Sequence, residues 1–341
     1  MPSKFTTPSA PLIALFCAAL LAPLPAAAQA TKLRFAVFIP ESPVVTDVFK
    51  GFADAVNKDA KGTVEVEVFA NGALGRNPLQ QAQMVLDGVA DIAWVILPQS
   101  RGKFRESEVL ELPGLFLDVT EASTVSARMV TKGHLKGFEE YFPVGVVGTG
   151  PMSIHSRGQV QSLADLKGKK IRAAGPMESN TIKALGAVPV GLTVNEVIEA
   201  IGRGNVDGIT SLPSVLFDFG IAQVTTTHYF NRLGNLPMAI LMNRKKFDGL
   251  PAAGQDAIRK HSGEWIAARF NESQGPYYVS LTKQMQADPK RKVIFPGEAE
   301  FSATRELFRP VYQEWASQAP RNAELLKAIE GEIALVRGAR R

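Results

Sequence analysis

The sequence predicts an α/β protein built from two similar lobes. Residues 33–96 and 170–209 each alternate segments in the order strand, helix, strand, helix, strand. This order is typical of a mostly parallel sheet with helices on its faces. In both stretches, at 88–92 and 204–209, a glycine and an aspartate three positions later stand between a helix and a strand. Because glycine commonly ends helices, one such match is weak, but two at corresponding places indicate two lobes of one plan.

The elements of the first stretch follow from local patterns. Residues 33–37 alternate apolar and polar side chains, as a half-buried strand does. Ser42 is placed as the N-cap of a helix over 43–56, where apolar residues fall at helical spacing. Valine and glutamate alternate over 63–69, and after a second helix the apolar run 92–96 predicts a buried strand.

The second stretch repeats the plan with shorter elements. Residues 170–174 and 188–192 are predicted strands, with a helix over 179–185 between them. Thr193 can cap a further helix whose apolar residues follow at helical spacing. A short strand begins at Ile209.

The last third of the chain adds elements of both kinds. They are a strand over 238–242, a helical stretch over about 251–285, a strand over 292–295, and helices over about 300–318 and 323–337. We expect Gly275 and Pro276 to interrupt the helical stretch, because proline cannot donate the helical hydrogen bond.

This last third is too long for an appendage, so we expect it to complete both lobes. The chain then crosses between the lobes more than once. The first lobe is expected from 31–148 with about 237–276, and the second from 149–236 with about 277–341.

The N-terminus has the three parts of a secretory signal peptide. Lys4 is followed by an unbroken apolar run over 12–22 and by small residues with cleavage expected near Ala28 or Ala30. The apolar run is shorter than the ~20 residues of a membrane-spanning helix, which disfavours an uncleaved anchor. The sequence therefore predicts a signal over 1–30 and an exported mature protein, with a bacterial periplasm as its natural compartment.

The only cysteine, Cys17, lies inside this predicted signal. Phe16 precedes it where a lipoprotein signal has a small residue, so no lipid anchor is expected. The mature chain would then be free of cysteine. This excludes disulfides, cysteine-ligated zinc, iron–sulfur clusters and thiol nucleophiles.

The charge balance does not predict binding to nucleic acid. The 341-residue chain has 38 Lys and Arg against 33 Asp and Glu. Four of the basic residues lie near the ends of the chain: Lys4, Arg337, Arg340 and Arg341. The body is thus close to neutral, and no basic stripe interleaved with aromatic residues occurs.

The sequence lacks the motifs of common catalytic sites. It contains no G-x-S-x-G, H-E-x-x-H, phosphate-binding P-loop or complete G-x-G-x-x-G. Four histidines are too widely spaced to form a ligand pair along a helix: His134, His155, His228 and His261. We therefore expect no metal site and no cofactor, and a protein that binds a small molecule without transforming it.

A binding site is expected where strands end. Ligands of open α/β sheets sit beyond the carboxyl ends of the strands, and in two-lobed proteins they sit in the cleft. Arg172 lies toward the end of a predicted buried strand, where a guanidinium is costly unless it is paired. Its planar fork matches a carboxylate, although an Arg that reaches solvent or a neighbouring acid is an alternative.

Nine short motifs, in order along nearly the whole mature chain, resemble the solute receptors of tripartite ATP-independent periplasmic (TRAP) transporters. They lie at 69–75, 88–93, 112–116, 165–172, 196–201, 204–208, 228–230, 243–245 and 312–315. Each motif alone is weak evidence for this family, but the nine together in this order are fairly specific for it. One of them, D-L-K-G-x-K-x-R, ends at Arg172.

The resemblance implies a two-lobed fold of the periplasmic-binding-protein kind, with a ligand cleft, crossing strands and a long helix spanning both lobes. It also implies that Arg172 clamps a ligand carboxylate. The expected partners are a small-molecule carboxylate and the two TRAP permease subunits, which use a sodium gradient, while the receptor itself is a monomer that hydrolyses nothing. His228 matches a family position and can order an interlobe strand.

Two positions depart from the family pattern. Gly150 stands where many members carry a second arginine, and Ser211 stands where many carry asparagine. Neither can balance a second ligand carboxylate. Lys170, on the same strand face as Arg172, could do so, but it lies nearer the start of the strand, where a lysine normally reaches solvent. The pattern therefore favours a monocarboxylate such as a 2-oxo, hydroxy or aromatic acid.

The remaining candidates for the site come from the strand-end loops and nearby apolar residues. Trp94 and Phe217 can form apolar walls, although large aromatic residues are more often core. Ser42 and Gln99 can supply hydrogen bonds or serve as ordinary caps, and Thr149 lies beside Gly150.

Three function classes remain open: a transport receptor for an organic acid, a similar binding module for a sensor kinase or another importer, and an exported enzyme on a two-lobed scaffold. Neighbouring permease genes would separate the first two, and turnover of a bound ligand would reveal the third.

Overall fold

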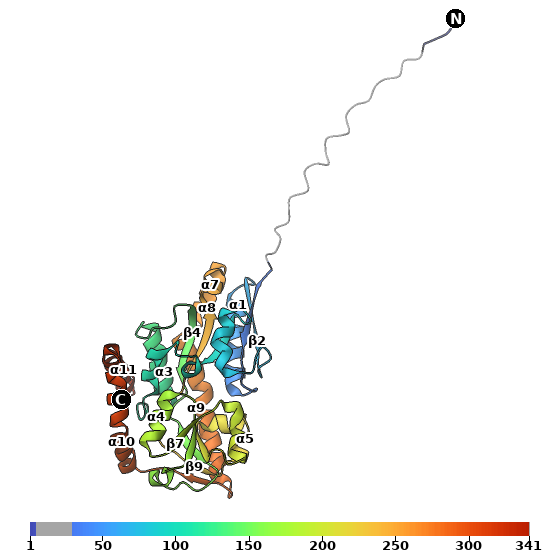
Figure 1. Ribbon diagram of the computed structural model, residues 1–341. Helices are drawn as coiled ribbons and strands as arrows, with labels where there is room; N and C mark the ends of the chain where they lie inside the picture. Colours follow the sequence, from blue (N-terminus) through green and yellow to red (C-terminus); the bar gives the residue numbers. More distant parts are fainter. Residues whose placement is uncertain (5–28, 341) are drawn as a thin grey trace.

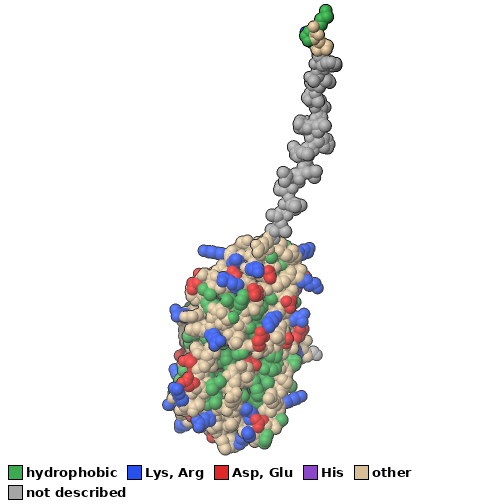
Figure 2. Space-filling model, turned by 90° about the vertical axis from the view of Figure 1, so that its right-hand side faces the viewer, with side chains coloured by type: hydrophobic (Ala, Val, Ile, Leu, Met, Phe, Trp, Pro, Cys, Tyr) green, Lys and Arg blue, Asp and Glu red, His purple; other side chains and the backbone are tan. Residues whose placement is uncertain are grey.

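The computed structural model describes residues 1–4 and 29–340. The predicted signal peptide falls mostly on residues 5–28, outside the described residues. None of the helices in the described part of the chain is long and apolar enough to cross a bilayer. On the face shown in Figure 2, Lys and Arg side chains are scattered among acidic ones rather than gathered into a stripe.

Two sheets form the centres of two lobes. The first sheet has the strand order β2-β1-β3-β10-β4. Its strands are β1 (Thr31–Ala36), β2 (Val64–Phe69), β3 (Ile92–Ile96), β4 (Tyr141–Gly148) and β10 (Pro237–Asn243). Strand β1 runs parallel to β2 and β3, whereas β10 runs antiparallel to β3 and β4.

The second sheet has the strand order β11-β9-β5-β8-β6-β7. Its strands are β5 (Ser153–Ser156), β6 (Lys170–Ala173), β7 (Val188–Gly191), β8 (Gly208–Ser211), β9 (Thr227–Tyr229) and β11 (Lys292–Ile294). Strand β6 is parallel to β7 and β8, and β5 is antiparallel to β8 and β9. Each lobe therefore joins a parallel part to antiparallel strands.

Helices surround both sheets. They are α1 (Gly51–Asp59), α2 (Gln81–Leu86), α3 (Val119–Thr131), α4 (Pro176–Ala184), α5 (Val197–Gly202), α6 (Pro213–Asp218), α7 (Arg244–Asp248), α8 (Ala252–Lys260), α9 (Glu264–Ala287), α10 (Glu298–Ser317) and α11 (Pro320–Ala339). The π-helical η1 (Val44–Lys50) precedes α1. The 3-10 segments are η2 (Pro78–Gln80), η3 (Leu97–Gln99), η4 (Arg105–Glu111), η5 (Leu163–Leu166), η6 (Val194–Glu196) and η7 (Ile221–Gln223).

The chain crosses between the lobes several times. It passes from β4 to β5 and returns from β9 to β10, which enters the middle of the first sheet. Helix α9 then contacts α3 and β4 in the first lobe and α6 and β11 in the second. Figure 1 shows α9 running through both halves of the molecule. The expected long helix spanning two α/β lobes is thus confirmed.

The expected helix break at Gly275 and Pro276 is wrong. Helix α9 continues through Pro276, and the helical stretch is divided earlier, between α8 and α9. Gly263 precedes α9 with a φ of 64°, in the left-handed region that glycine adopts without strain. A single proline removes one hydrogen bond of the helix, and in a helix held by two lobes this does not end it.

Helix α11 departs from the expected division of the chain. It packs against α3 and η4, which belong to the first lobe, although its residues were expected in the second. In Figure 1, α10 and α11 follow one side of the molecule along both lobes. The tail therefore links the lobes from outside, and the division of the other segments stays a proposal.

Candidate functional site

A cavity of about 100 Å³ lies between the two lobes. Its walls come from the loop after β1, from β3 and β10 in the first lobe, from β6 and β8 in the second, and from the interlobe helix α9. The parallel strands β1, β3, β6 and β8 reach it with their carboxyl ends, as expected for α/β sheets. Most of the lining is apolar.

Arg172 brings a positive charge to this cavity. It lies on β6 and is only 5% exposed. Its Nε donates a hydrogen bond of 2.9 Å to the carbonyl oxygen of Leu192. None of the ion pairs among the described residues includes Arg172, so the rest of its fork has no carboxylate partner there. Burial lowers the pKa of Arg172, and the negative charges of Glu178 and Glu196 oppose this.

A buried guanidinium without a counter-ion is costly, and arginine stays protonated at neutral pH. The arrangement therefore favours an anion that enters the cavity and pairs with the free part of the fork. The small Ala174 next to β6 also lines the cavity and leaves room for such a group.

Strand β8 supplies two hydroxyl groups beside Arg172. Thr210 and Ser211 line the cavity, and both are almost fully buried. The hydroxyl of Thr210 donates to the carbonyl oxygen of Arg172 at 3.2 Å. This bond joins β8 to β6 beside the cavity and helps to fix the position of one strand end relative to the other.

A partly buried arginine and two buried histidines form a chain of contacts that ends at the carbonyl oxygen of Ser211 on β8. Arg291 Nη1 lies 3.2 Å from His228 Nε2, and His228 Nδ1 lies 3.0 Å from His155 Nδ1. His155 Nε2 lies 3.3 Å from the carbonyl oxygen of Ser211. Because arginine can only donate, His228 accepts at Nε2 and donates to His155, which in turn donates to Ser211. Burial lowers the pKa of both histidines, that of His228 to about 4, so both are neutral at pH 7.

Aromatic side chains form the apolar wall. Trp94 of β3 packs against Phe49, with ring centroids 4.9 Å apart, and lies 6.5 Å from Phe270 of α9. Trp94 and Phe270 both line the cavity. A ligand body placed here would replace water with apolar contacts, while its charge would face Arg172.

Known proteins share this architecture. A family described as bacterial extracellular solute-binding protein, family 7, matches residues 36–318. The chain belongs to this family. This protein is therefore a solute-binding receptor and not an enzyme.

The receptor is similar to several relatives over almost its whole length. It is 26% identical to a solute-binding protein of Sulfitobacter, over 90% of this chain and 93% of the relative. It is 24% identical to the C4-dicarboxylate-binding periplasmic protein of Rhodobacter capsulatus, over 91% and 93%. A TRAP solute-binding protein from Rhodoferax ferrireducens, solved with copurified benzoate, superposes with a TM-score of 0.85 at 23% identity and covers 92% of this chain and 100% of its own.

The structure brings together half of the residues that the sequence singled out for the site. Four of the eight predicted residues line the cavity: Trp94, Thr149, Arg172 and Ser211. The other four lie outside its lining: Ser42, Gln99, Gly150 and Phe217.

Gly150 follows the cavity residue Thr149 in the chain but does not line the cavity. Its N–H donates to Asn235 Oδ1 at 3.0 Å, and its φ is 94°. A Cβ at this position would lie 3.0 Å from the backbone of Val119. The position therefore suits glycine for steric reasons, whatever the ligand.

The other three residues lie outside the cavity lining. Gln99 of η3 donates through Nε2 to the carbonyl oxygen of Ala174 at 3.1 Å, which connects the two lobes beside the cavity. The expectation that Ser42 caps the helix after it is wrong: Pro43 is the N-cap residue of η1, and the Ser42 hydroxyl has no hydrogen-bond partner among the described residues. Only the carbonyl oxygen of Ser42 takes part, accepting from Val45 N at 2.9 Å. Phe217 packs against the core, with the Arg291 guanidinium 6.0 Å from its ring.

Sequence reasoning missed the cavity residues that come from helices. Asp218 at the end of α6 and Gln274 and Tyr278 on α9 line the cavity. The expected site residues lay on strands, in strand-end loops and, for Phe217, on α6, and nothing in the local pattern shows which faces of α6 and α9 meet the strand ends. Tyr278 and Phe270 lie eight residues apart on α9, and that spacing on one helix face is the only signal available.

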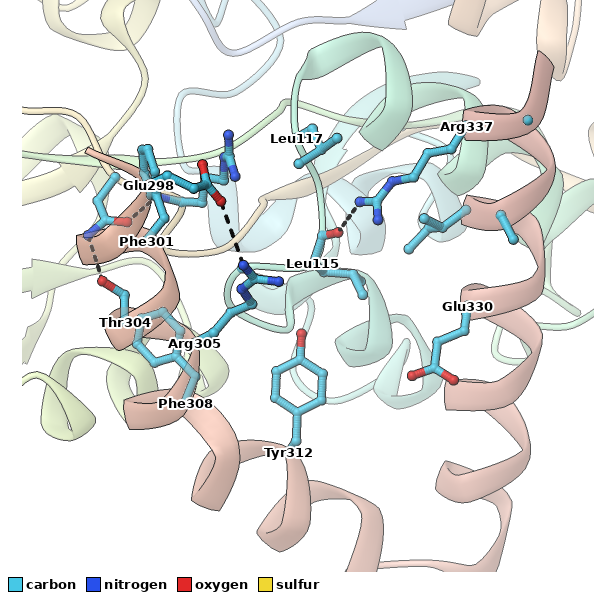
Figure 3. A pocket seen from close by; sticks show the side chains of 16 residues that line it. Leu115, Leu117, Glu298, Phe301, Thr304, Arg305, Phe308, Tyr312, Glu330 and Arg337 are labelled. Atoms are coloured by element: carbon cyan, nitrogen blue, oxygen red, sulfur yellow. Dashed lines mark hydrogen bonds and ion pairs between the residues drawn. The ribbon is translucent and has the colours of Figure 1, made fainter. Parts of the chain in front are cut away.

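A second, larger hollow of about 650 Å³ lies between α10, α11 and the loop at 114–117 (Figure 3). Two of the three arginines that line it have acidic partners, and the third, Arg232, lies over the Phe301 ring with its guanidinium 4.3 Å from the ring centroid. Arg337 donates to Glu121 and to the Leu115 carbonyl oxygen, and Arg305 lies 3.7 Å from Glu298. The loop after β9 reaches this hollow, but the ends of β1, β3, β6 and β8 do not line it. The interlobe cavity is therefore the stronger candidate site despite its smaller volume.

Proposed function

We propose that the receptor captures a small organic acid with a single carboxylate in the interlobe cavity and delivers it to a sodium-coupled TRAP permease. The observation that carries this proposal is Arg172, a buried cation that reaches the cavity and has no acidic partner within 4.0 Å among the described residues. Its fork would hold the ligand carboxylate, and the aromatic wall would enclose the body. Export to the periplasm through the N-terminal signal is part of the same proposal.

The lining of the cavity supports one carboxylate rather than two. Arg172 is the only Lys, Arg or His side chain among the described residues that line it. A second carboxylate would lose its water without gaining a cation, at a cost of several kcal/mol. Ser211 has one hydroxyl, which suits a neutral group of the ligand better than a full charge. The Rhodobacter relative named for C4-dicarboxylates is therefore not a guide to this ligand.

A panel of purified acids tests the proposal. Mass spectrometry of what copurifies with the mature protein would give candidate ligands. Thermal-shift assays would then compare monocarboxylates such as benzoate, pyruvate and lactate with succinate, malate and fumarate. We expect the monocarboxylates to stabilise the receptor more at equal concentration. Preferential stabilisation by the C4-dicarboxylates would overturn the single-carboxylate assignment.

We further predict that binding closes the lobes. The lobes are joined by crossing strands and α9, so a ligand that contacts both favours a rigid-body hinge motion rather than refolding. Small-angle scattering should show a smaller radius of gyration with saturating ligand. The variant Arg172→Met at the same ligand concentration serves as a control and should keep the unliganded value. An unchanged radius for the wild type would count against closure.

A further inference from the structure

The interlobe cavity contains an acid as well as the arginine. Asp218 is the last residue of α6 and lines the same cavity as Arg172. The two residues lie on different elements, and neither a hydrogen bond nor an ion pair among the described residues joins them. The cavity therefore offers a ligand one cationic side chain and, separately, one carboxylate.

Asp218 is held in place from outside the cavity. The hydroxyl of Tyr277, on α9, donates to Asp218 Oδ1 at 2.7 Å. Tyr277 does not line the cavity, whereas Asp218 does. Burial raises the pKa of Asp218, and the bond from Tyr277 lowers it. Tyr277 thus uses one carboxylate oxygen, while Oδ2 of this half-buried residue accepts no hydrogen bond from the described residues.

This second group limits what can fill the cavity. A ligand that is purely apolar at this end would cover Oδ2 of Asp218 without giving it a donor, which is unfavourable. A ligand with a second carboxylate there would place two negative charges together. A ligand with an O–H or N–H group would instead satisfy Asp218.

We propose that Asp218 selects for a hydrogen-bond donor on the ligand, so that the preferred solute is a monocarboxylic acid bearing a hydroxyl or amino group away from its carboxylate. This inference rests on the proposed function, because it assumes that Arg172 holds the carboxylate. It makes Asp218 a specificity-determining residue and Tyr277 a positioning residue. It also gives a reason beyond the missing second cation for the exclusion of dicarboxylates.

Matched acids that differ in one substituent test this directly. Calorimetry would compare benzoate with 3-hydroxybenzoate, 4-hydroxybenzoate, 3-aminobenzoate and benzene-1,3-dicarboxylate, and propionate with lactate and 3-hydroxypropionate. In the wild type, we expect at least one donor-bearing acid to bind at least about tenfold more tightly than its unsubstituted parent. Comparison of the hydroxybenzoates with 3-aminobenzoate shows whether Asp218 prefers an O–H or an N–H donor.

Two variants test whether Asp218 causes the preference for donor-bearing acids. Asp218→Asn keeps an acceptor for Tyr277 and turns its NH2 group toward the ligand, and Asp218→Leu removes the acceptor altogether. Both should reduce the preference to within about threefold, while the parent acid binds as well as before or better. Asp256→Asn, on an exposed carboxylate of α8, is the matched control and should keep the wild-type preference.

The outcomes separate this inference from the proposed function. If the acids bind in an Arg172-dependent way but a hydroxyl or amino group brings no gain, Asp218 is not a selector and only the inference fails. The same holds if both Asp218 variants keep the full preference. If no acid in either series binds the wild type, the proposed function fails together with the inference.

Discussion

Replacing Arg172 with methionine should weaken binding of the receptor's carboxylate ligand at least about a hundredfold while the fold stays intact. Methionine keeps much of the apolar stem and removes the fork. Breaking one side of a desolvated charge pair costs ~3 to 5 kcal/mol, which corresponds to a factor of about one hundred or more in Kd. Isothermal titration with the copurifying acid measures the loss directly.

An exposed arginine provides the matched control. Arg203, at the end of α5, is 71% exposed, and its ion pair among the described residues is with Glu199, one turn away. Arg203→Met should therefore bind the acid like the wild type. Urea unfolding of Arg172→Met should show a stable protein, since the substitution removes a buried cation that has no counter-ion without ligand. Wild-type affinity in Arg172→Met would show that the carboxylate binds elsewhere.

The parallel strands could be predicted from sequence because their signals are local. Alternating valine and glutamate places β2 at the edge of the first sheet, and the apolar run of β3 matches a strand buried between β1 and β10. The partners of β10 could not be predicted in this way. It enters the sheet between β3 and β4 only after the chain has built most of the second lobe, and periodicity carries no information about such distant pairing.

The same contrast between local signals and long-range packing applies to the residues of the candidate site. Arg172 could be found because a charged residue in a predicted buried strand breaks a local rule, and such conflicts often mark functional positions. Asp218 lies at the end of a short helix, where an acidic residue is expected on the surface. Its sequence context therefore gives no sign of a functional role. Only the packing of α6 against α9 places it at the cavity.

Replacing Glu178 should have a large effect on the stability of the folded receptor. It lies in the first turn of α4, is 4% exposed, and accepts a hydrogen bond of 2.7 Å from Ala174 N. Its Oε1 has no partner among the described residues. Burial raises the pKa of Glu178 from 4.5 to about 7, against the opposing effects of Arg172 and the Ala174 N–H. Glu111, a buried residue of η4, has its pKa raised by burial and by the charges of Glu108 and Glu178.

The direction of the pH effect follows from the raised pKa. The folded protein binds more protons at Glu178 than the unfolded chain between about pH 4.5 and 7, so the free energy of unfolding falls as pH rises through this window. Above it, the ionised carboxylate costs up to about 3 kcal/mol, because one pKa unit corresponds to ~1.4 kcal/mol. Glu178→Gln keeps an acceptor for Ala174 N and removes the ionisation. We expect it to be about 2 to 3 kcal/mol more stable than the wild type at pH 8, with the difference shrinking toward zero at pH 5.

Urea unfolding of ligand-free protein at pH 5, 6, 7 and 8 measures this difference. Glu199→Gln, on a side chain that is 64% exposed, is the control and should follow the wild type at every pH. Glu111 still titrates in Glu178→Gln, so part of the pH dependence should persist, shifted to lower pH because the charge of Glu178 no longer raises the pKa of Glu111. A Glu178→Gln protein that is no more stable than the wild type at pH 8 would show that the Glu178 carboxylate is not destabilised by burial in the folded receptor.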